Sequence, residues 1–329
     1  MKLIKNDCLQ MNELIKEGLN FEKYTTSGKE DFQNFTRDAE INKKRGLSED
    51  TITDNLLVKG NNLLVLHSLV KEFRGKVKCI YIDPPYNTGN DSFNYNDKFN
   101  HSTWLCFMKN RLEIAQELLS DEGSIFISID ERMKSYLDIL IRTNNLFNFF
   151  RELIWESGAP LRFKGTKNIW PHIHETIFHY CKNKSEIDYK PTYTFEKWST
   201  GEPVLTGDII KAKENKIYSM DFIVGAKQSV GFGTGQKPEE LIKKLLEATT
   251  NEHDIVLDFF SGSGTTGAVA HKMNRQWIMV EQMDYIETIT KERMKKVIEG
   301  EQGGISKSVN WQGGGEFVYF ELKKDFINK

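Results

Sequence analysis

The sequence predicts an α/β fold built on a mainly parallel sheet, with a smaller region inserted into it. Along most of the chain, strand-length apolar runs alternate with helix-length apolar patterns, which is typical of parallel strands joined by crossover helices. Between residues 151 and 235 this alternation stops, and aromatic residues, glycines and lysines are interleaved without helical periodicity. Because 329 residues exceed an average domain, they can form one large α/β domain together with the inserted region.

Each element is expected where an apolar pattern of the right length is bounded by turn residues. The run at 77–82 is apolar and partly β-branched and ends abruptly at Asp83, so it is expected to be a buried parallel strand. Further strands are expected at residues 124–129, 255–259 and 277–281, short strands near 192–195, and an edge strand at 317–322. Helices are expected within 55–73, at 103–119, at 266–273, and from Pro238, which suits the first turn of a helix.

Composition and charge narrow the class of protein. The chain carries a net charge of −2, so any phosphate-binding surface must be local. No segment approaches the roughly 18 apolar residues of a membrane span, and residues 1–10 lack the pattern of a signal peptide, so we expect a cytoplasmic protein. The four cysteines are widely spaced, which indicates free thiols, and no pattern of cysteines or histidines indicates a metal site.

A glycine-rich loop joins the strand expected at 255–259 to the following helix. Backbone N–H groups at such a helix start can approach a ligand closely, and Gly262-x-Gly264-x-x-Gly267 matches the dinucleotide fingerprint. Glu281 follows Gly262 by 19 residues, where a ribose-binding carboxylate is expected. An NAD-dependent oxidoreductase is therefore one interpretation of this loop, and a glycine turn that merely packs is another.

Two features favour a sulfonium cofactor over a dinucleotide. The carboxylate of Asp258 would repel a pyrophosphate but attract the ammonium of a methionine moiety, and opposite charges about 4 Å apart are worth about 4 kcal/mol at an effective dielectric of about 20. Only 48 residues follow Glu281, too few for the second half of a dinucleotide-binding domain. A methionine-based sulfonium therefore fits the glycine loop better.

The strand at 77–82 runs into Asp83-Pro84-Pro85-Tyr86. Two consecutive prolines give a rigid, extended exit, which fixes the Asp83 carboxylate and the Pro84 carbonyl. An aromatic amino group is a poor nucleophile, and two such acceptors can hold its N–H groups so that its lone pair points at a sulfonium methyl. Tyr86 can stack on a base displaced from the duplex, where the amino group is otherwise inaccessible. A Pro-Pro turn without function is the alternative, which the presence of two loops at strand ends disfavours.

With these two loops in this order, the chain resembles the β class of amino-methylating DNA methyltransferases, in which Asp-Pro-Pro-Tyr precedes the cofactor loop. Residues 81–89, 128–131 and 313–322 look like modification subunits of type III restriction systems. The resemblance implies a Rossmann-like S-adenosylmethionine-dependent methyltransferase fold with a target-recognition region shorter than those subunits generally have. It implies five regions: an N-terminal extension at 1–54, a catalytic half at 55–150, a target-recognition region at 151–233, a cofactor-binding half at 234–300 and a C-terminal extension at 301–329.

By this resemblance, Asp83, Pro84, Pro85 and Tyr86 are catalytic and the cofactor is S-adenosylmethionine. Glu281 is expected on the ribose hydroxyls, and Lys237 or Thr234 near the methionine end. The expected cofactor residues together are Thr234, Lys237, Asp258, Phe260, Gly262, Gly264, Thr265, Thr266 and Glu281.

The type III likeness and the Asp at position 83 favour N6 of adenine in DNA as the methyl acceptor, with N4 of cytosine as the alternative. A non-catalytic DNA-recognition subunit and an RNA substrate also stay open. DNA is the expected partner, and a restriction subunit and a second copy of the chain are candidate partners.

Candidate DNA contacts lie in the inserted region. Arg162, Lys164 and Lys167 are candidates for phosphate contacts, and Trp170 for stacking on a base. A solvated charged loop and a packed aromatic cluster that includes Trp155 are the alternatives. The polar segment 87–101, directly after the catalytic loop, is expected to form a mobile lid over the base pocket.

Overall fold

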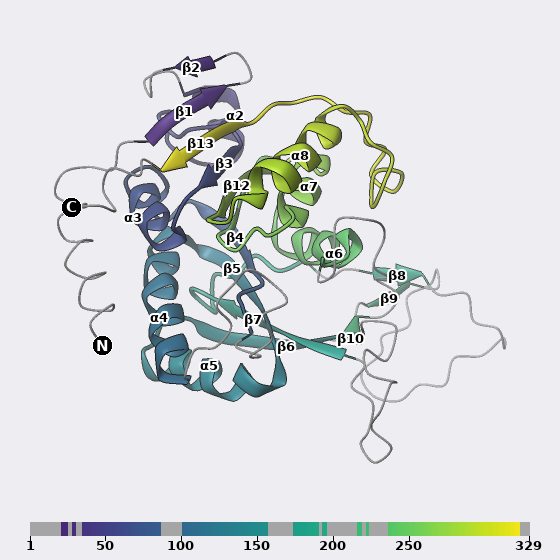
Figure 1. The fold of residues 1–329 in the computed structure, drawn as a ribbon. Coiled ribbons are helices and arrows are strands. Elements are labelled where there is room, and N and C mark those ends of the chain that lie inside the picture. Colours follow the sequence, from purple (N-terminus) through teal and green to yellow (C-terminus); the bar gives the residue numbers. More distant parts are fainter. Residues whose placement is uncertain are drawn as a thin grey trace, which may run out of the picture.

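The computed structural model describes residues 21–25, 28–30, 35–86, 101–156, 174–190, 193–195, 216–218, 222–223 and 236–322. Within this part of the chain, eleven strands form one sheet in the order β10-β6-β7-β5-β4-β11-β12-β3-β13-β1-β2, and β8 and β9 form a second, two-stranded sheet. Helices cover both faces of the large sheet, so the fold is α/β with three layers (Figure 1).

The central strands of the large sheet are parallel, so they all end at one edge. This edge is where open α/β sheets bind their ligands. In sheet order, these strands are β5 (Leu119–Ile129), β4 (Val77–Ile82), β11 (Ile255–Asp258), β12 (Gln276–Glu281), β3 (Leu56–Lys59) and β13 (Val318–Leu322).

Further strands extend the sheet at both ends. β7 (His174–Cys181) pairs antiparallel with β5, β6 (Asn148–Glu156) pairs antiparallel with β7, and β10 (Phe222–Ile223) pairs parallel with β6. At the other end, β1 (Phe21–Thr25) pairs antiparallel with β13, and β2 (Gly28–Glu30) pairs with β1. The expectation that β13 is an edge strand is therefore wrong, because β1 from the N-terminal part of the chain covers it.

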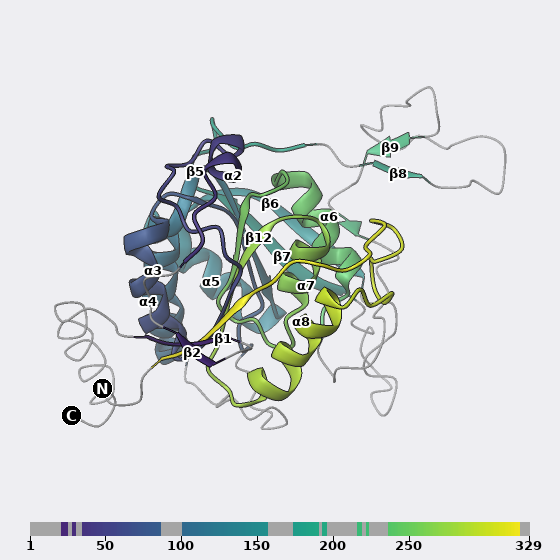
Figure 2. The ribbon, with the colours of Figure 1, turned by 90° about the horizontal axis from the view of Figure 1, so that it is seen from above.

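The segment between residues 151 and 235 is only partly distinct from the large sheet. β6 begins before residue 151 and β7 pairs with β5, so both strands belong to the large sheet. β8 (Tyr193–Phe195) and β9 (Lys216–Tyr218) form the small antiparallel sheet, which stands apart from the large one (Figure 2). The division of the chain into five regions stays a prediction.

Among the described residues, three helices pack against the core on each side of the sheet, and Figures 1 and 2 show helices on both faces. Asn61 and Asp130 cap the starts of α3 and α5 with side-chain oxygens, which satisfies N–H groups that the helices leave free. One face carries α3 (Asn62–Phe73), α4 (His101–Leu118) and α5 (Glu131–Thr143), and the other carries α6 (Glu239–Thr249), α7 (Thr265–Lys272) and α8 (Lys291–Ile298). The short α2 (Ala39–Lys44) precedes β3, and the π-helical turn η2 (Ile286–Thr290) runs into α8.

Side chains of β4 alternate between the two hydrophobic cores. Ile80 and Ile82 lie in the core under α3 and α4, whereas Cys79 and Tyr81 lie in the core under α6 and α7. Because successive strand residues point to opposite faces, Asp83 continues the side of Tyr81. The Asp83-Pro84-Pro85-Tyr86 loop therefore begins on the face that carries α6, α7 and α8.

The expected strands at 77–82, 255–259 and 277–281 are confirmed to within one residue. The strand expected at 124–129 is longer, because Leu119 already pairs with Val77 and the register then shifts across an irregularity. No helix among the described residues combines the length and the apolar composition that a membrane span requires.

Candidate active site

Three carboxylates lie at the carboxyl ends of adjacent strands. Asp83 follows β4, Asp258 ends β11 and Glu281 ends β12, and these strands are neighbours in the sheet. The two loops that the sequence singles out therefore lie next to each other. This edge of the sheet is the candidate active site.

The Asp83-Pro84-Pro85-Tyr86 loop is held by one hydrogen bond from α4 and one within the loop. The indole Nε1 of Trp104, on α4, donates a hydrogen bond of 2.7 Å to the carbonyl of Pro85. Tyr86 is half-buried, and its hydroxyl donates to Oδ1 of Asp83. Burial and the nearby Asp83 carboxylate raise the pKa of Tyr86 well above its usual value, so the phenol stays protonated. The stacking of Tyr86 on a base stays a prediction.

Lys237 contacts the Asp83-Pro84-Pro85-Tyr86 loop. Its Nζ lies 2.8 Å from Oδ2 of Asp83 and 3.0 Å from the hydroxyl of Tyr86. Burial opposes the charged form of Lys237, but the neighbouring carboxylates outweigh it and raise the pKa of this ammonium well above its usual value. The expected contact of Lys237 with the methionine end of a cofactor stays a prediction.

Glu175, at the start of β7, is a site residue that the motifs do not reveal. Its Oε2 lies 3.0 Å from Nζ of Lys237 and 3.4 Å from the hydroxyl oxygen of Tyr86. Asp83, Glu175 and Lys237 form what we term the site cluster. The only local signal for Glu175 is its place directly before the apolar run that forms the rest of β7.

The glycine loop has the conformation that its glycines permit. Gly262 and Gly264 have φ values of +50° and +81°, in the left-handed region. A Cβ on Gly264 would lie 2.8 Å from Cγ2 of Thr290, and one on Gly267 would lie 2.3 Å from Cε of Met279. The first two glycines therefore shape the loop, whereas Gly267 lets α7 pack closely on β12.

Asp258 and Glu281 are both buried at the glycine loop. Oδ1 of Asp258 accepts from the backbone N–H of Phe260, and Oε2 of Glu281 accepts from that of Gly262, each at 3.0 Å. Burial raises the pKa of Asp258 to about 7, although the hydroxyl of Thr266 donates to its Oδ2 at 2.6 Å. A bound cation would return this carboxyl to its charged form.

The other expected cofactor residues of the loop contact the protein itself. Phe260 is buried and packs on the Phe107 ring, with 5.9 Å between ring centres. The hydroxyl of Thr265 accepts a hydrogen bond of 2.9 Å from Arg293. These side chains shape the loop, and their contact with a cofactor stays a prediction.

Four buried or half-buried charges lie behind the loop, and we term them the helix cluster: Glu239, Lys272, Arg293 and Glu301. Glu239 begins α6, two residues after Lys237, and Arg293 on α8 bonds both to it and to Thr265. The helix cluster therefore ties the start of α6 to the start of α7. These two helix starts carry Lys237 and the glycine loop.

Several expected residues lie outside the described part of the chain. They are the cofactor candidate Thr234, the DNA-contact candidates Arg162, Lys164, Lys167 and Trp170, and residues 87–100 of the expected lid. Trp155 is described and is buried in the core under α6 and α7. Among the described residues, no group of three or more His, Cys, Asp or Glu side chains could hold a metal ion, and Cys79, Cys106 and Cys181 are free thiols.

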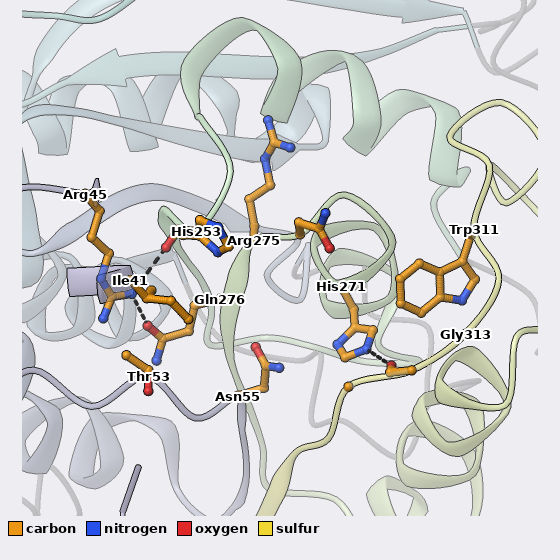
Figure 3. Close-up of a pocket in the computed structure, with 13 residues that line it drawn as sticks. Ile41, Arg45, Thr53, Asn55, His253, His271, Arg275, Gln276, Trp311 and Gly313 are labelled. Carbon is orange, nitrogen blue, oxygen red and sulfur yellow. Dashed lines mark hydrogen bonds between the residues drawn. The ribbon is translucent and has the colours of Figure 1, made fainter. Parts of the chain in front are cut away.

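A hollow of about 290 Å³ lies at the opposite edge of the sheet, where β3 and β12 begin (Figure 3). Its polar side chains are largely bonded to the protein. Arg45 donates to Gln276, Trp277 donates to Nδ1 of His271, and Nε2 of His271 in turn lies 2.9 Å from the Gly314 carbonyl. The hollow is therefore separate from the candidate active site.

The comparisons with known proteins agree with this geometry. A family model described as "DNA methylase" matches residues 77–292. The chain is similar to a Haemophilus influenzae protein named "Probable type III restriction-modification enzyme HindVI Mod subunit", with 36% identity over 92% of this chain and 57% of that protein. The chain therefore spans little more than half the length of this relative.

Solved structures share the fold. The structure of M1.HpyAVI in complex with SAM is 21% identical, covers 73% of this chain and 98% of that one, and has a TM-score of 0.50. The cytosine-N4-specific PvuII DNA methyltransferase is 16% identical, covers 74% of this chain and 91% of that one, and has a TM-score of 0.51. At these identities the likeness shows the fold alone.

Proposed function

The chain belongs to the DNA methylase family, and from this premise we propose that it transfers the methyl group of S-adenosylmethionine to N6 of adenine in DNA. The observation that carries the proposal is the juxtaposition of two loops, Asp83-Pro84-Pro85-Tyr86 after β4 and the glycine loop after the neighbouring β11. One loop offers acceptors for an amino group and the other offers glycines and a carboxylate for a cofactor. Methyl donor and methyl acceptor would thus meet between them.

The glycine loop fits S-adenosylmethionine. Oγ of Ser261, in this loop, is buried and has no hydrogen-bond partner among the described residues. Asp258 provides a carboxylate for the ammonium of the methionine part, and Glu281 one for the ribose hydroxyls. When bound, S-adenosylmethionine supplies a methyl group on a positively charged sulfur.

The chain's own residues would orient the amino group. The carboxylate of Asp83 and the carbonyl of Pro84 can each accept one N–H of the displaced base, which turns the nitrogen lone pair toward the methyl. As the nitrogen gains positive charge, the fixed negative charge of Asp83 stabilises it, because the carboxylate is already oriented by Tyr86 and Lys237. The pocket thereby offsets the few kcal/mol that unstacking a base costs.

We propose adenine rather than cytosine because Asp83 precedes the Pro-Pro-Tyr sequence and because of the likeness to a type III Mod subunit. The fold does not decide this point, since the cytosine-N4-specific PvuII enzyme shares it. Enzymatic digestion of DNA after the reaction, followed by mass spectrometry of the nucleosides, distinguishes N6-methyldeoxyadenosine from N4-methyldeoxycytidine.

DNA and other protein chains are the proposed partners. The HindVI relative is named as a Mod subunit, so a restriction subunit is a proposed partner of this chain, together with a second copy of the chain. Target recognition by residues 151–233, with contacts from Arg162, Lys164, Lys167 and Trp170, belongs to the same proposal.

Replacement of Asp83 by Ala tests the proposed function. We expect transfer of labelled methyl to DNA to fall about 10²- to 10³-fold, because a preorganised charge opposite the amino nitrogen is lost. Binding of S-adenosylmethionine, measured by calorimetry, should fall by no more than about tenfold, which is less than the loss of methyl transfer. Asp121→Ala is the matched control and should retain wild-type transfer. It changes an exposed carboxylate near the start of β5, at the end of the strand away from the site.

Four results would contradict the proposed function or change it. Equal methyl transfer by the wild type and the Asp83→Ala variant would show that the loop is not catalytic. Binding of NAD but not of S-adenosylmethionine by the wild type would assign the glycine loop to a dinucleotide. Binding of DNA without methyl transfer by the wild type would instead indicate a recognition subunit, and transfer to RNA in preference to DNA would change the substrate.

A further inference from the structure

We propose that Glu175 is a charge-balancing residue of the active site. It neutralises Lys237, so that the site cluster keeps a net negative charge and favours the positively charged sulfonium of the cofactor over the neutral thioether of its product. The inference rests on the proposed function and deepens it, because it names a residue that sets how the site discriminates between S-adenosylmethionine and S-adenosylhomocysteine.

Lys237 contacts two carboxylates and one phenol. Its Nζ lies 2.8 Å from Oδ2 of Asp83, 3.0 Å from Oε2 of Glu175 and 3.0 Å from the hydroxyl of Tyr86. The ammonium donates hydrogen bonds to Asp83 and Tyr86 and forms an ion pair with Glu175. Lys237 is therefore fully committed to the two carboxylates and the phenol.

Glu175 reaches the catalytic loop because of the sheet topology. β7 and β4 flank β5, so Glu175 and Asp83 stand on either side of that strand. Ile177, two residues further along β7, lies in the same core as Tyr81, two residues before Asp83. Since side chains two residues apart share a face, both carboxylates project on the side of α6, where Lys237 precedes the helix.

The charges of the site cluster are unequal in number and in exposure. Two carboxylates surround one ammonium, which leaves a net charge of −1. The side chain of Lys237 is 9% exposed, whereas those of Asp83 and Glu175 are 25% and 23% exposed. The positive charge is therefore buried, and the open side of the cluster presents carboxylates.

Without Glu175, the buried ammonium would cancel the charge of Asp83. The pair would still orient the Asp83 carboxylate, but it would offer little net attraction to a sulfonium or to an amino nitrogen that gains positive charge. Glu175 allows both functions, because Lys237 can hold Asp83 while the cluster as a whole stays negative. A unit charge near a ligand in a partly buried site changes its affinity by roughly tenfold.

S-adenosylmethionine and S-adenosylhomocysteine make a suitable pair of probes. They differ by one methyl group and by the charge on sulfur, while their ammonium, carboxylate and adenosine parts are the same. We expect Glu175→Gln to lower the affinity for S-adenosylmethionine about tenfold and to leave that for S-adenosylhomocysteine unchanged, as measured by calorimetry. Glu175→Asp, which keeps the charge, should restore the wild-type ratio of the two affinities.

The converse variant and a control sharpen the test. Lys237→Met makes the cluster more negative and should raise the affinity ratio, and the Glu175→Gln/Lys237→Met double variant should return it toward the wild-type value. Glu152→Gln is the matched control. Glu152 lies on the neighbouring β6 and also pairs with a lysine, and its side chain is similarly exposed, at 33%. Its ratio should equal that of the wild type.

The outcomes separate this inference from the proposed function. An affinity ratio that is the same in the wild type and the Glu175→Gln variant, or an equal loss of both ligands, would overturn the inference and leave the proposed function in place. Wild-type protein that binds neither ligand would overturn both. A thermal unfolding curve for each variant identifies losses that come from unfolding.

Discussion

The site cluster and the helix cluster lie on the same face of the sheet and differ in charge balance. In the helix cluster, Lys272 bonds to Glu239 and to Glu301 at 2.9 Å each, and Arg293 bonds to Glu239 at 2.8 Å. Two cations thus meet two carboxylates, and the cluster is neutral. The site cluster carries a net charge of −1, although only Pro238 separates Lys237 from Glu239 in sequence.

Burial accounts for the difference. The side chains of Glu239, Lys272 and Arg293 are 5%, 0% and 2% exposed, and an unbalanced charge at that depth would cost several kcal/mol. Asp83 and Glu175 retain contact with solvent, so an excess of one negative charge is tolerated there. The helix cluster, which holds the helices together, is thus neutral. The site cluster, which is proposed to meet a cation, is negative.

The largest effect on stability is expected from unbalancing the helix cluster. Glu239→Gln removes the carboxylate that Lys272 and Arg293 share, so we expect a loss of about 3–5 kcal/mol in the free energy of unfolding. Urea denaturation measures it. The neighbouring Glu240→Gln, with a side chain that is 42% exposed, should change the same quantity by less than about 1 kcal/mol. Similar losses in both variants would show that burial does not distinguish the two carboxylates.

A loss of stability of similar size, which depends on pH, is expected at Asp258. Its nearest charged neighbours include Asp83 and Glu281, and burial raises its pKa to about 7 from an ordinary 3.8. Between these pH values the unfolded chain has lost the proton that the folded protein retains. The stability of the cofactor-free protein should therefore fall by about 1.4 kcal/mol per pH unit as the pH rises from about 4 to about 7, and then level off.

Asp258→Asn should abolish this pH dependence. The variant should be more stable than the wild type at pH 8 in the absence of cofactor, and it should bind S-adenosylmethionine more weakly because the carboxylate is gone. Urea denaturation at pH 5, 6, 7 and 8 checks the first point. Asp284→Asn, which changes an almost fully exposed side chain, is the control and should keep the wild-type profile. A wild-type stability that does not decline over this range would contradict a buried, protonated Asp258.

The residues that could be predicted from sequence are those whose position is set by one strand. Asp83, Asp258 and Glu281 each end or follow a continuous apolar run, and parallel strands end at a common edge, so local pattern was enough to bring them together. The α/β class and the central strands follow from the same patterns. The glycine loop could be predicted as well, because its conformation depends on residue type within a few positions.

Glu175 and the helix cluster could not be predicted in the same way. Whether β7 runs parallel or antiparallel to β5 decides which end of it reaches the site, and no local pattern fixes that direction. Glu239 and Arg293 meet across 54 positions of sequence, and each on its own looks like an ordinary charge on an amphipathic helix. Their burial depends on how three helices pack, which is a property of the assembled fold.

The smallest effect is expected at Tyr81, which tests whether charge alone sets the discrimination between the two cofactor forms. Its buried hydroxyl lies 2.8 Å from Oγ of Ser128, and burial raises its pKa, so the phenol is neutral. Tyr81→Phe should lower the free energy of unfolding by about 0.5–1.5 kcal/mol, and a Tyr81→Phe/Ser128→Ala double variant should lose less than the sum of the single variants, because no group is left unpaired. Since no charge changes, the ratio of affinities for S-adenosylmethionine and S-adenosylhomocysteine should equal that of the wild type. A ratio that moves as far as in Glu175→Gln would show that packing near β4, rather than the net charge of the site cluster, controls the sulfonium.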